Sequence, residues 1–222
     1  GRILNAPISE SGFLGAAVTA AMSGLKPIVE IMLVDFIGVC VGGLLNEAAK
    51  IQDFSGGKWN VPMVVRTACG GGYGDGGQHE QALWGWLAHI PGLNIVVPSN
   101  PADAGGLMLA SIESDDPVVF FEHKLLADYW RDYLGEGGRD GLDYNVPPAA
   151  AECEVPEKWE SLPFGKVNKL SEGEDISIIS LGVGVHRALE AAQELQSDGK
   201  TVDLLDLRWC FTADEIAEPS DL

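Results

Sequence analysis

The chain has 222 residues, 46% of them hydrophobic, which is enough to bury one complete core and begin a second. Its formal net charge of −19 argues against binding to nucleic acids or to anionic membrane surfaces. No apolar run is long enough to span a bilayer, because Gly, Lys, Glu or Asp interrupts each one. The cysteines lie far apart and form no CxxC pair, which suits a reducing cytosol or organelle matrix; they are Cys40, Cys69, Cys153 and Cys210.

Strand and helix patterns alternate along the first half of the chain. A strand start is expected at residues 2–5, followed after Pro7 by a helix of small residues. Further strands are expected at 28–34, 61–66, 94–98 and 118–121, and helices at 38–54, 80–89 and 101–114. The nearly continuous apolar run at 28–34 is typical of a strand buried on both faces. This alternation predicts an α/β fold whose parallel sheet carries helices on both faces.

The pattern breaks at residues 126–163, which are rich in Asp, Glu, Gly and Pro. We interpret this segment as a linker whose aromatic residues pack on a surface. Alternation resumes with strands at 176–180 and 202–207 around a helix at 185–196. We therefore expect a first domain at 1–125, the linker at 126–163, and the start of a second α/β domain at 164–222. The chain starts at Gly1 and stops soon after a strand, so we expect a fragment at both ends.

The stretch CGGGYGDGGQHEQ, from Cys69 to Gln81, follows an expected strand and precedes an expected helix. That is where ligands bind in open α/β sheets. The stretch matches neither GxGxxG nor GxxxxGK[ST], and Asp75 would repel a phosphate. A loop that approaches a ligand closely and presents His79 is the better interpretation, because a neutral imidazole there could transfer protons. The alternative is that His79 simply begins a helix and has no function.

Two more side chains follow strand ends in apolar surroundings. Glu10 is either an acid that complements a helix dipole or a carboxylate aimed at a ligand, with a pKa raised by burial. Phe36 is either a core residue or a wall on which a flat ring could stack. The residues alone leave both alternatives open.

Several stretches together resemble one enzyme family. They are APISESGFLGAAVTAAMSGLKPIVEIMLVDF, GGQHEQALWGWLAHIPGLNIVVPSNPADAGGLMLASIESDDPVVFFEHK, PFGKV at 163–167 and DLR at 206–208. The chain is similar to the beta subunit of the thiamine-diphosphate-dependent 2-oxoacid dehydrogenases, which serve the pyruvate, branched-chain 2-oxoacid and acetoin dehydrogenase complexes. The resemblance implies a transketolase-like pyrimidine-binding domain followed by the start of a transketolase C-terminal-type domain.

The resemblance also implies roles for individual residues. Glu10 matches the glutamate that hydrogen-bonds the aminopyrimidine ring nitrogen and so supports general acid–base catalysis through the cofactor. Phe36 matches the aromatic residue against the pyrimidine, with Ile8 and Met32 as apolar neighbours. His79 matches the histidine near the reacting carbon, which assists acyl transfer to a lipoyl arm. These residues are the expected catalytic and cofactor-binding set.

Two metal ions belong to the same resemblance. The family's Mg²⁺ is held mainly by the partner alpha subunit, together with the diphosphate. A potassium site would fall on oxygens of Met63, Ser111, Ser114 and Asp116, and Ser114 stands where the family usually has an aspartate. A second departure is Glu80, because the family usually reads QHSQ where this chain reads QHEQ.

The expected partners follow from the same family. They are an alpha subunit in an alpha2beta2 heterotetramer, a lipoyl-bearing acyltransferase component and a small 2-oxoacid, in a bacterial or archaeal cytoplasm or a mitochondrial matrix. Two alternatives remain open. One is another thiamine enzyme, of the transketolase or deoxyxylulose-phosphate synthase group. The other is a non-catalytic subunit or acidic interaction module that retains the fold.

Overall fold

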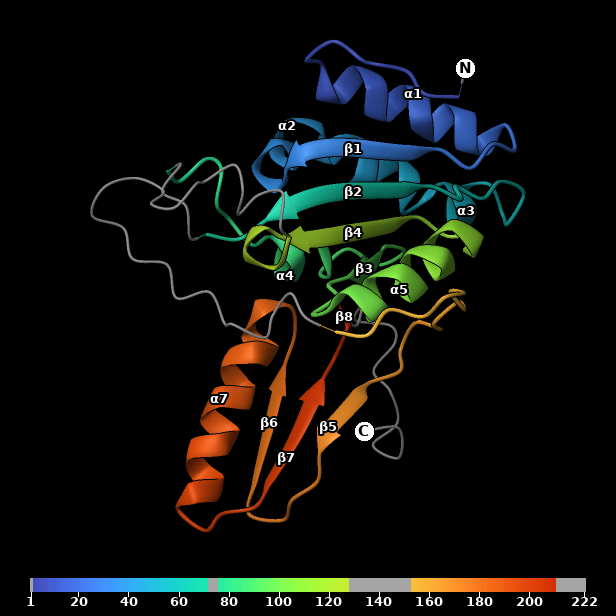
Figure 1. Cartoon of the computed structure of the whole chain (residues 1–222). Helices are drawn as coiled ribbons and strands as arrows, with labels where there is room; N and C mark the ends of the chain where they lie inside the picture. Colours follow the sequence, from blue (N-terminus) through green and yellow to red (C-terminus); the bar gives the residue numbers. More distant parts are fainter. Residues whose placement is uncertain (1, 72–75, 128–152, 211–222) are drawn as a thin grey trace.

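The computed structural model describes residues 2–71, 76–127 and 153–210, which form two sheets with flanking helices (Figure 1). The larger sheet has the order β1 (Ile28–Leu33), β2 (Val64–Cys69), β4 (Val118–His123), β3 (Asn94–Val96), β8 (Trp209–Cys210). The smaller sheet has the order β5 (Asn168–Ser171), β7 (Val202–Asp206), β6 (Ile176–Ser180). Pairing is parallel except for β3 with β8 and β5 with β7, which confirms the predicted α/β class.

Helices cover both faces of the larger sheet. The first half of the chain contains α1 (Glu10–Met22), η1 (Val34–Phe36), α2 (Ile37–Gly42), η2 (Gly43–Ala48), α3 (Ile51–Phe54), α4 (Trp84–Leu87), α5 (Pro101–Glu113) and η3 (Lys124–Leu126). A core shared with α1, α2 and η2 fills one face of the sheet, and α5 packs on the other face through Leu107. The smaller sheet is flanked by α7 (Val183–Ser197).

The strand β1 is an edge strand, so the expectation that it is buried on both faces is wrong. Its side chains alternate between exposed and buried. Glu30 points outward and pairs with Arg66 of β2 at 3.0 Å. The apolar run misled the prediction because Ile28 and Met32 are apolar but lie on the exposed side.

Three other predicted elements differ from the structure. Residues 2–5 form no strand, and Ile3 is 88% exposed. The helix expected at 80–89 shrinks to α4, because the backbone carbonyl of Gln81 accepts from the Gly70 N–H at 2.9 Å. This hydrogen bond joins the two ends of the glycine-rich segment 70–81, called the glycine loop below. The helix expected at 38–54 is interrupted between η2 and α3.

The short antiparallel strands β5 and β8 were not predicted, since so few residues carry little periodic signal. The strand β8 adds a piece of the second half of the chain to the larger sheet. Of the predicted linker at 126–163, residues 126–127 and 153–163 are described; Leu126 ends η3, and residues 153–163 run along α5. The Trp159 ring lies against Gly105, and the Leu162 N–H donates to the Gly106 carbonyl at 3.1 Å. The linker aromatics Tyr129, Trp130, Tyr133 and Tyr144 lie outside the described residues.

Among the described residues, the helices are all too short or too polar to cross a membrane.

Candidate functional site

Three connecting segments meet at the carboxyl ends of β1, β2 and β4. They are η1 after β1, the glycine loop after β2, and η3 after β4. The loop begins at Gly70, whose φ of +87° suits glycine, and a Cβ there would lie 2.1 Å from the His123 ring nitrogen Nε2. The first glycine of the run therefore lets the backbone pass directly over β4.

His79 lies in a turn at the end of this loop. Its backbone N–H donates to the Gly76 carbonyl at 3.1 Å. Its ring meets the Phe36 ring edge to face, with centroids 5.6 Å apart and an interplanar angle of 88°. The ring nitrogen Nδ1 is buried and has no hydrogen-bond partner among the described residues. The structure thus brings two predicted site residues together, and one of them carries a buried nitrogen that no described residue satisfies.

The turn is held from all three strand ends. From β4, the Lys124 ammonium donates to the His79 carbonyl oxygen. From β2, the Gly70 N–H donates to the Gln81 carbonyl. From η1 after β1, Asp35 Oδ1 accepts from the Gln81 side-chain amide at 2.6 Å, while Asp35 Oδ2 is buried without a partner in the described part of the chain. Sequence reasoning missed Lys124 and Gln81, because their contacts join segments far apart in the chain.

Glu10 is the first residue of α1 and is half-buried. The Ser11 hydroxyl ties this end of the helix to α2 by donating to the Val39 carbonyl at 2.9 Å. Burial raises the pKa of the Cys40 thiol to about 11, and the negative charge of Glu10 adds to that rise. Glu10 therefore lies within electrostatic range of α2, which begins directly after Phe36.

The two predicted apolar neighbours are exposed. Ile8 is 97% exposed, in the coil before α1. Met32 is 63% exposed and lies at an irregularity in β1, where pairing with β2 passes from Ile31 to Leu33. Neither side chain belongs to an apolar core among the described residues.

The residues expected to bind potassium lie at the opposite end of the strands. The Met63 carbonyl accepts from the Val118 N–H at 2.9 Å, and the Ser111 hydroxyl donates to the Leu107 carbonyl at 2.7 Å. The Ser114 hydroxyl and the backbone of Asp116 hydrogen-bond each other in the turn after α5. An ion bound there would support the α5–β4 turn and would lie far from the His79 chemistry.

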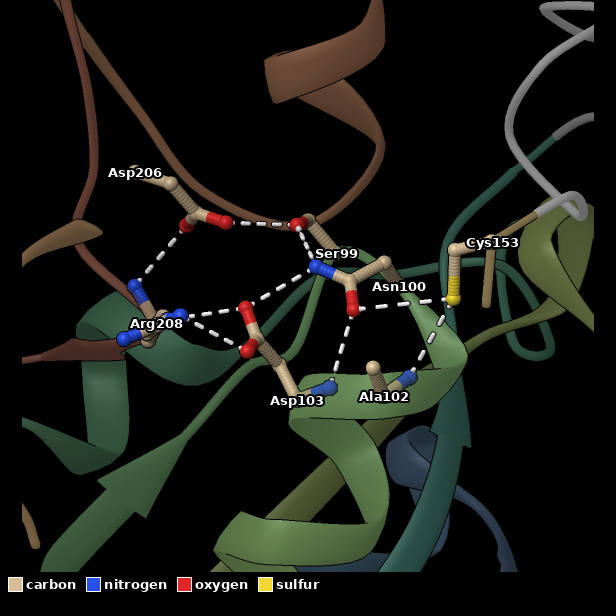
Figure 2. A network of polar contacts seen from close by, with 7 residues as sticks. All are labelled: Ser99, Asn100, Ala102, Asp103, Cys153, Asp206 and Arg208. Carbon is tan, nitrogen blue, oxygen red and sulfur yellow. Dashed lines mark hydrogen bonds and ion pairs between the residues drawn. The ribbon is translucent and has the colours of Figure 1, made fainter. Parts of the chain in front are cut away.

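A network of polar contacts that the sequence reasoning did not assign joins α5 to the end of β7 (Figure 2). The Arg208 guanidinium binds both carboxylate oxygens of Asp103, at 2.8 and 2.7 Å. Asp206 accepts from the Ser99 hydroxyl at 2.5 Å and from the Arg208 N–H at 2.9 Å. The His186 ring nitrogen Nε2 hydrogen-bonds the Ser99 carbonyl at 2.7 Å. The only sequence signal was the DLR segment, noted for its resemblance alone.

This network is structural. Burial raises the pKa of Asp206, and the Ser99 hydrogen bond opposes that rise. Arg208 adopts a φ of +58°, an unusual value outside glycine, which the surrounding contacts fix. The contacts connect the two sheets and place no reactive group toward the His79 turn.

Comparisons with known proteins agree with this architecture. Residues 1–128 match the family described as transketolase, pyrimidine binding domain, and residues 165–218 match transketolase, C-terminal domain. Two solved structures share the fold with a TM-score of 0.66. One is a split-gene transketolase described as an inactive beta4 tetramer, 20% identical over 91% of this chain and 56% of that chain. The other is a transketolase from Campylobacter jejuni, 16% identical over 96% of this chain and 29% of that chain.

Curated relatives are more similar in sequence. The acetoin:2,6-dichlorophenolindophenol oxidoreductase subunit beta of Bacillus subtilis is 43% identical over 97% of this chain and 57% of its own length. The 2-oxoisovalerate dehydrogenase subunit beta of the same organism is 39% identical over 97% and 60%. The pyruvate dehydrogenase E1 component subunit beta of Staphylococcus epidermidis is 37% identical over 93% and 57%.

This chain therefore spans little more than half the length of these relatives. The family itself is established by the match that covers more than half of the chain: the chain belongs to the transketolase pyrimidine-binding domain family, with a transketolase C-terminal domain after it.

Proposed function

We propose that this chain is the beta subunit of the decarboxylating component of a 2-oxoacid dehydrogenase complex. It would act with an alpha subunit in an alpha2beta2 heterotetramer, decarboxylate a small 2-oxoacid and pass the acyl group to a lipoyl-bearing acyltransferase component. The observation that carries the proposal is the Phe36–His79 pair at the carboxyl ends of the strands, with a buried ring nitrogen that no described residue satisfies. The curated relatives support it, since all three are beta subunits of dehydrogenases or oxidoreductases.

The residues at this end of the sheet fit thiamine diphosphate. Ile8 and Met32 expose apolar side chains, Phe36 offers a partly open ring, and Glu10 offers a half-buried carboxylate. Together they suit a flat aminopyrimidine, with Glu10 accepting a hydrogen bond from its ring nitrogen. When bound, thiamine diphosphate would supply a carbon nucleophile and an electron sink for decarboxylation. Mg²⁺ would be held mainly by the alpha subunit.

His79 would act on the acyl group. Its half-buried imidazole carries a buried Nδ1 that no described residue satisfies, and imidazoles commonly serve as proton acceptors and donors in enzymes. The edge-on Phe36 ring limits how the imidazole can rotate and keeps water from that side. We therefore assign His79 to proton transfer during acyl transfer to the lipoyl thiol.

A potassium ion on oxygens of Met63, Ser111, Ser114 and Asp116 belongs to the same proposal. Its part would be structural, since these residues lie where α5 ends and β2 and β4 begin. The Lys26 ammonium already donates to the Ser114 carbonyl at 3.2 Å. Because this hydrogen bond holds Ser114 without the ion, we expect removal of potassium to lower thermal stability only modestly. The ratio of decarboxylation to acyl transfer should be unchanged.

The Glu10→Gln variant tests the proposed function. In the full-length chain assembled with its alpha subunit, we expect proton exchange at the cofactor's reactive carbon and turnover of the 2-oxoacid to fall at least about 100-fold. Pyruvate, branched-chain 2-oxoacids and acetoin should each be assayed, together with ketol transfer between sugar phosphates. Glu190→Gln, at an exposed position of α7, is the matched control and should behave like the unmodified enzyme. Near-normal exchange in Glu10→Gln, or ketol transfer as the main activity, would refute the assignment.

A further inference from the structure

Lys124 carries a positive charge into the protein interior next to the His79 turn. It is only 1% exposed, at the start of η3 directly after β4. Fully buried lysines are rare, because removing an ammonium from water is costly unless other groups bind it. The ammonium donates a hydrogen bond to the backbone carbonyl of His79. The position of this charge is therefore tied to the conformation of the turn.

The charges around Lys124 come from all three strand ends. Lys124, Glu122 and Asp35 all act on the Cys69 thiol at the end of β2, where burial is the main reason that the pKa of the thiol is raised. Both oxygens of Glu122 already bind Arg66, each at 2.7 Å. Lys124 thus shares the surroundings of the Cys69 thiol with two carboxylates, and its hydrogen bond to the His79 carbonyl links this charged cluster to the turn.

We propose that Lys124 is a positioning residue for His79. Its ammonium would fix the carbonyl of His79, so that the imidazole stays edge-on to Phe36. The proposal rests on the proposed function, because it takes the acyl-transfer role of His79 as its starting point. Lys124 itself touches neither substrate nor cofactor in this account.

The other two anchors of the turn explain why a third is needed. Gln81 binds the Gly70 N–H through its carbonyl and Asp35 through its amide, so both contacts hold the turn at one residue. His79 lies two residues earlier, where its N–H binds the Gly76 carbonyl within the turn and the Lys124 ammonium binds its carbonyl from β4. A displacement of about 1 Å at a catalytic group can cost roughly 100-fold in rate.

The kinetic test uses the full-length chain assembled with its alpha subunit. In Lys124→Met, we expect acyl transfer to a lipoyl domain to fall 10- to 100-fold. Decarboxylation, followed with an artificial electron acceptor, should stay within about threefold with an unchanged KM, since the pyrimidine contacts remain. Lys124→Arg restores a charged donor and should recover part of the acyl transfer. Lys169→Met removes an exposed lysine that pairs with Asp203 at 2.8 Å in the smaller sheet, and should change neither rate.

Amide hydrogen exchange gives a second readout that does not depend on activity. In Lys124→Met, the His79 amide, which binds the Gly76 carbonyl, should exchange at least about tenfold faster. Amides of β6 and β7 should be unchanged in the same sample. If the unmodified assembly shows no decarboxylation, the proposed function fails, and this exchange still decides whether Lys124 holds the turn. An unchanged His79 amide, or equal losses of decarboxylation and acyl transfer, overturns the positioning role.

Discussion

Two polar clusters, the His79 turn and the Asp103–Arg208 junction, differ in how completely their buried polar atoms are hydrogen-bonded. At the junction, each carboxylate oxygen of Asp103 meets a guanidinium nitrogen, and both oxygens of Asp206 accept hydrogen bonds. At the turn, His79 Nδ1 and Asp35 Oδ2 are buried without partners among the described residues. Buried polar atoms are nearly always paired in folded proteins. The paired cluster therefore serves the architecture, and the unpaired atoms mark where a ligand would complete the hydrogen bonding.

Removing the charge at the junction should have the largest effect on stability. Arg208→Met keeps a long side chain at the same backbone position, yet removes the positive charge that pairs with the buried Asp103 carboxylate. We expect the free energy of unfolding to drop by about 3–5 kcal/mol, measured by urea denaturation. Lys200→Met, at an exposed position, is the control. A loss below about 1 kcal/mol would show that the junction is not the structural cluster described above.

Adding a side chain at Gly70, where the glycine loop passes close to His123, should cause the next largest loss of stability. Gly70→Ala combines an unfavourable φ of +87° with a clash against the His123 ring. We expect a loss of roughly 3 kcal/mol together with displacement of the His79 turn. Gly24→Ala has a similar φ, +91°, but no atom within 4 Å of the new Cβ, so it isolates the backbone strain at about 1 kcal/mol. Equal losses of stability in the two variants would mean that the His123 ring moves aside without a measurable energetic penalty.

Lowering the pH should decrease the free energy of unfolding through the protonation of His123. Burial lowers the pKa of His123 to about 4, and the charges of Arg187 and Lys124 act in the same direction. Between pH 6.5 and about 4 the unfolded chain therefore binds more protons at this residue than the folded chain. This contribution to stability is complete above pH 6.5 and is lost as the pH falls, by roughly 2–3 kcal/mol.

His123→Asn keeps an acceptor for the Leu125 N–H and removes this titration. The difference in unfolding free energy between the variant and the unmodified chain should therefore shrink as the pH falls from 6.5 to 4. If that difference is independent of pH, His123 does not titrate as described.

Removing the N-terminal cap of α5 should cause the smallest loss of stability. The Asn100 side chain accepts from the Asp103 N–H at 2.9 Å, so Asn100→Ala should cost about 1 kcal/mol. Ser9 stands at the same position before α1 and makes no side-chain cap bond, so Ser9→Ala should cost almost nothing. Thermal unfolding of both variants measures the difference. Equal costs would contradict the capping role of Asn100.

The sequence predicted what local patterns encode. The strands β2, β4, β6 and β7 overlap the strands predicted at 61–66, 118–121, 176–180 and 202–207, and α5 begins at Pro101 as predicted. Phe36 and His79 were selected separately, and the structure brings their rings together. The roles of Glu10, Ile8 and Met32 stay predictions.

What the sequence could not predict depends on contacts between distant segments. Lys124 reaches His79 across 45 residues, and Arg208 reaches Asp103 across 105. The short strand β8 is defined only by its pairing with β3. The failed strand at residues 2–5 illustrates the same point, since an apolar run becomes a strand only where another strand pairs with it.

The separate effects of His79 on decarboxylation and on acyl transfer give the most direct test of the central claim, that this end of the sheet is the reactive site. In the assembled enzyme, decarboxylation with an artificial electron acceptor and acyl transfer to a lipoyl domain should be measured on the same preparation of His79→Ala. The account predicts that acyl transfer falls about 100-fold or more, while decarboxylation falls less than about tenfold. Equal losses of both rates, or no loss of either, would contradict it.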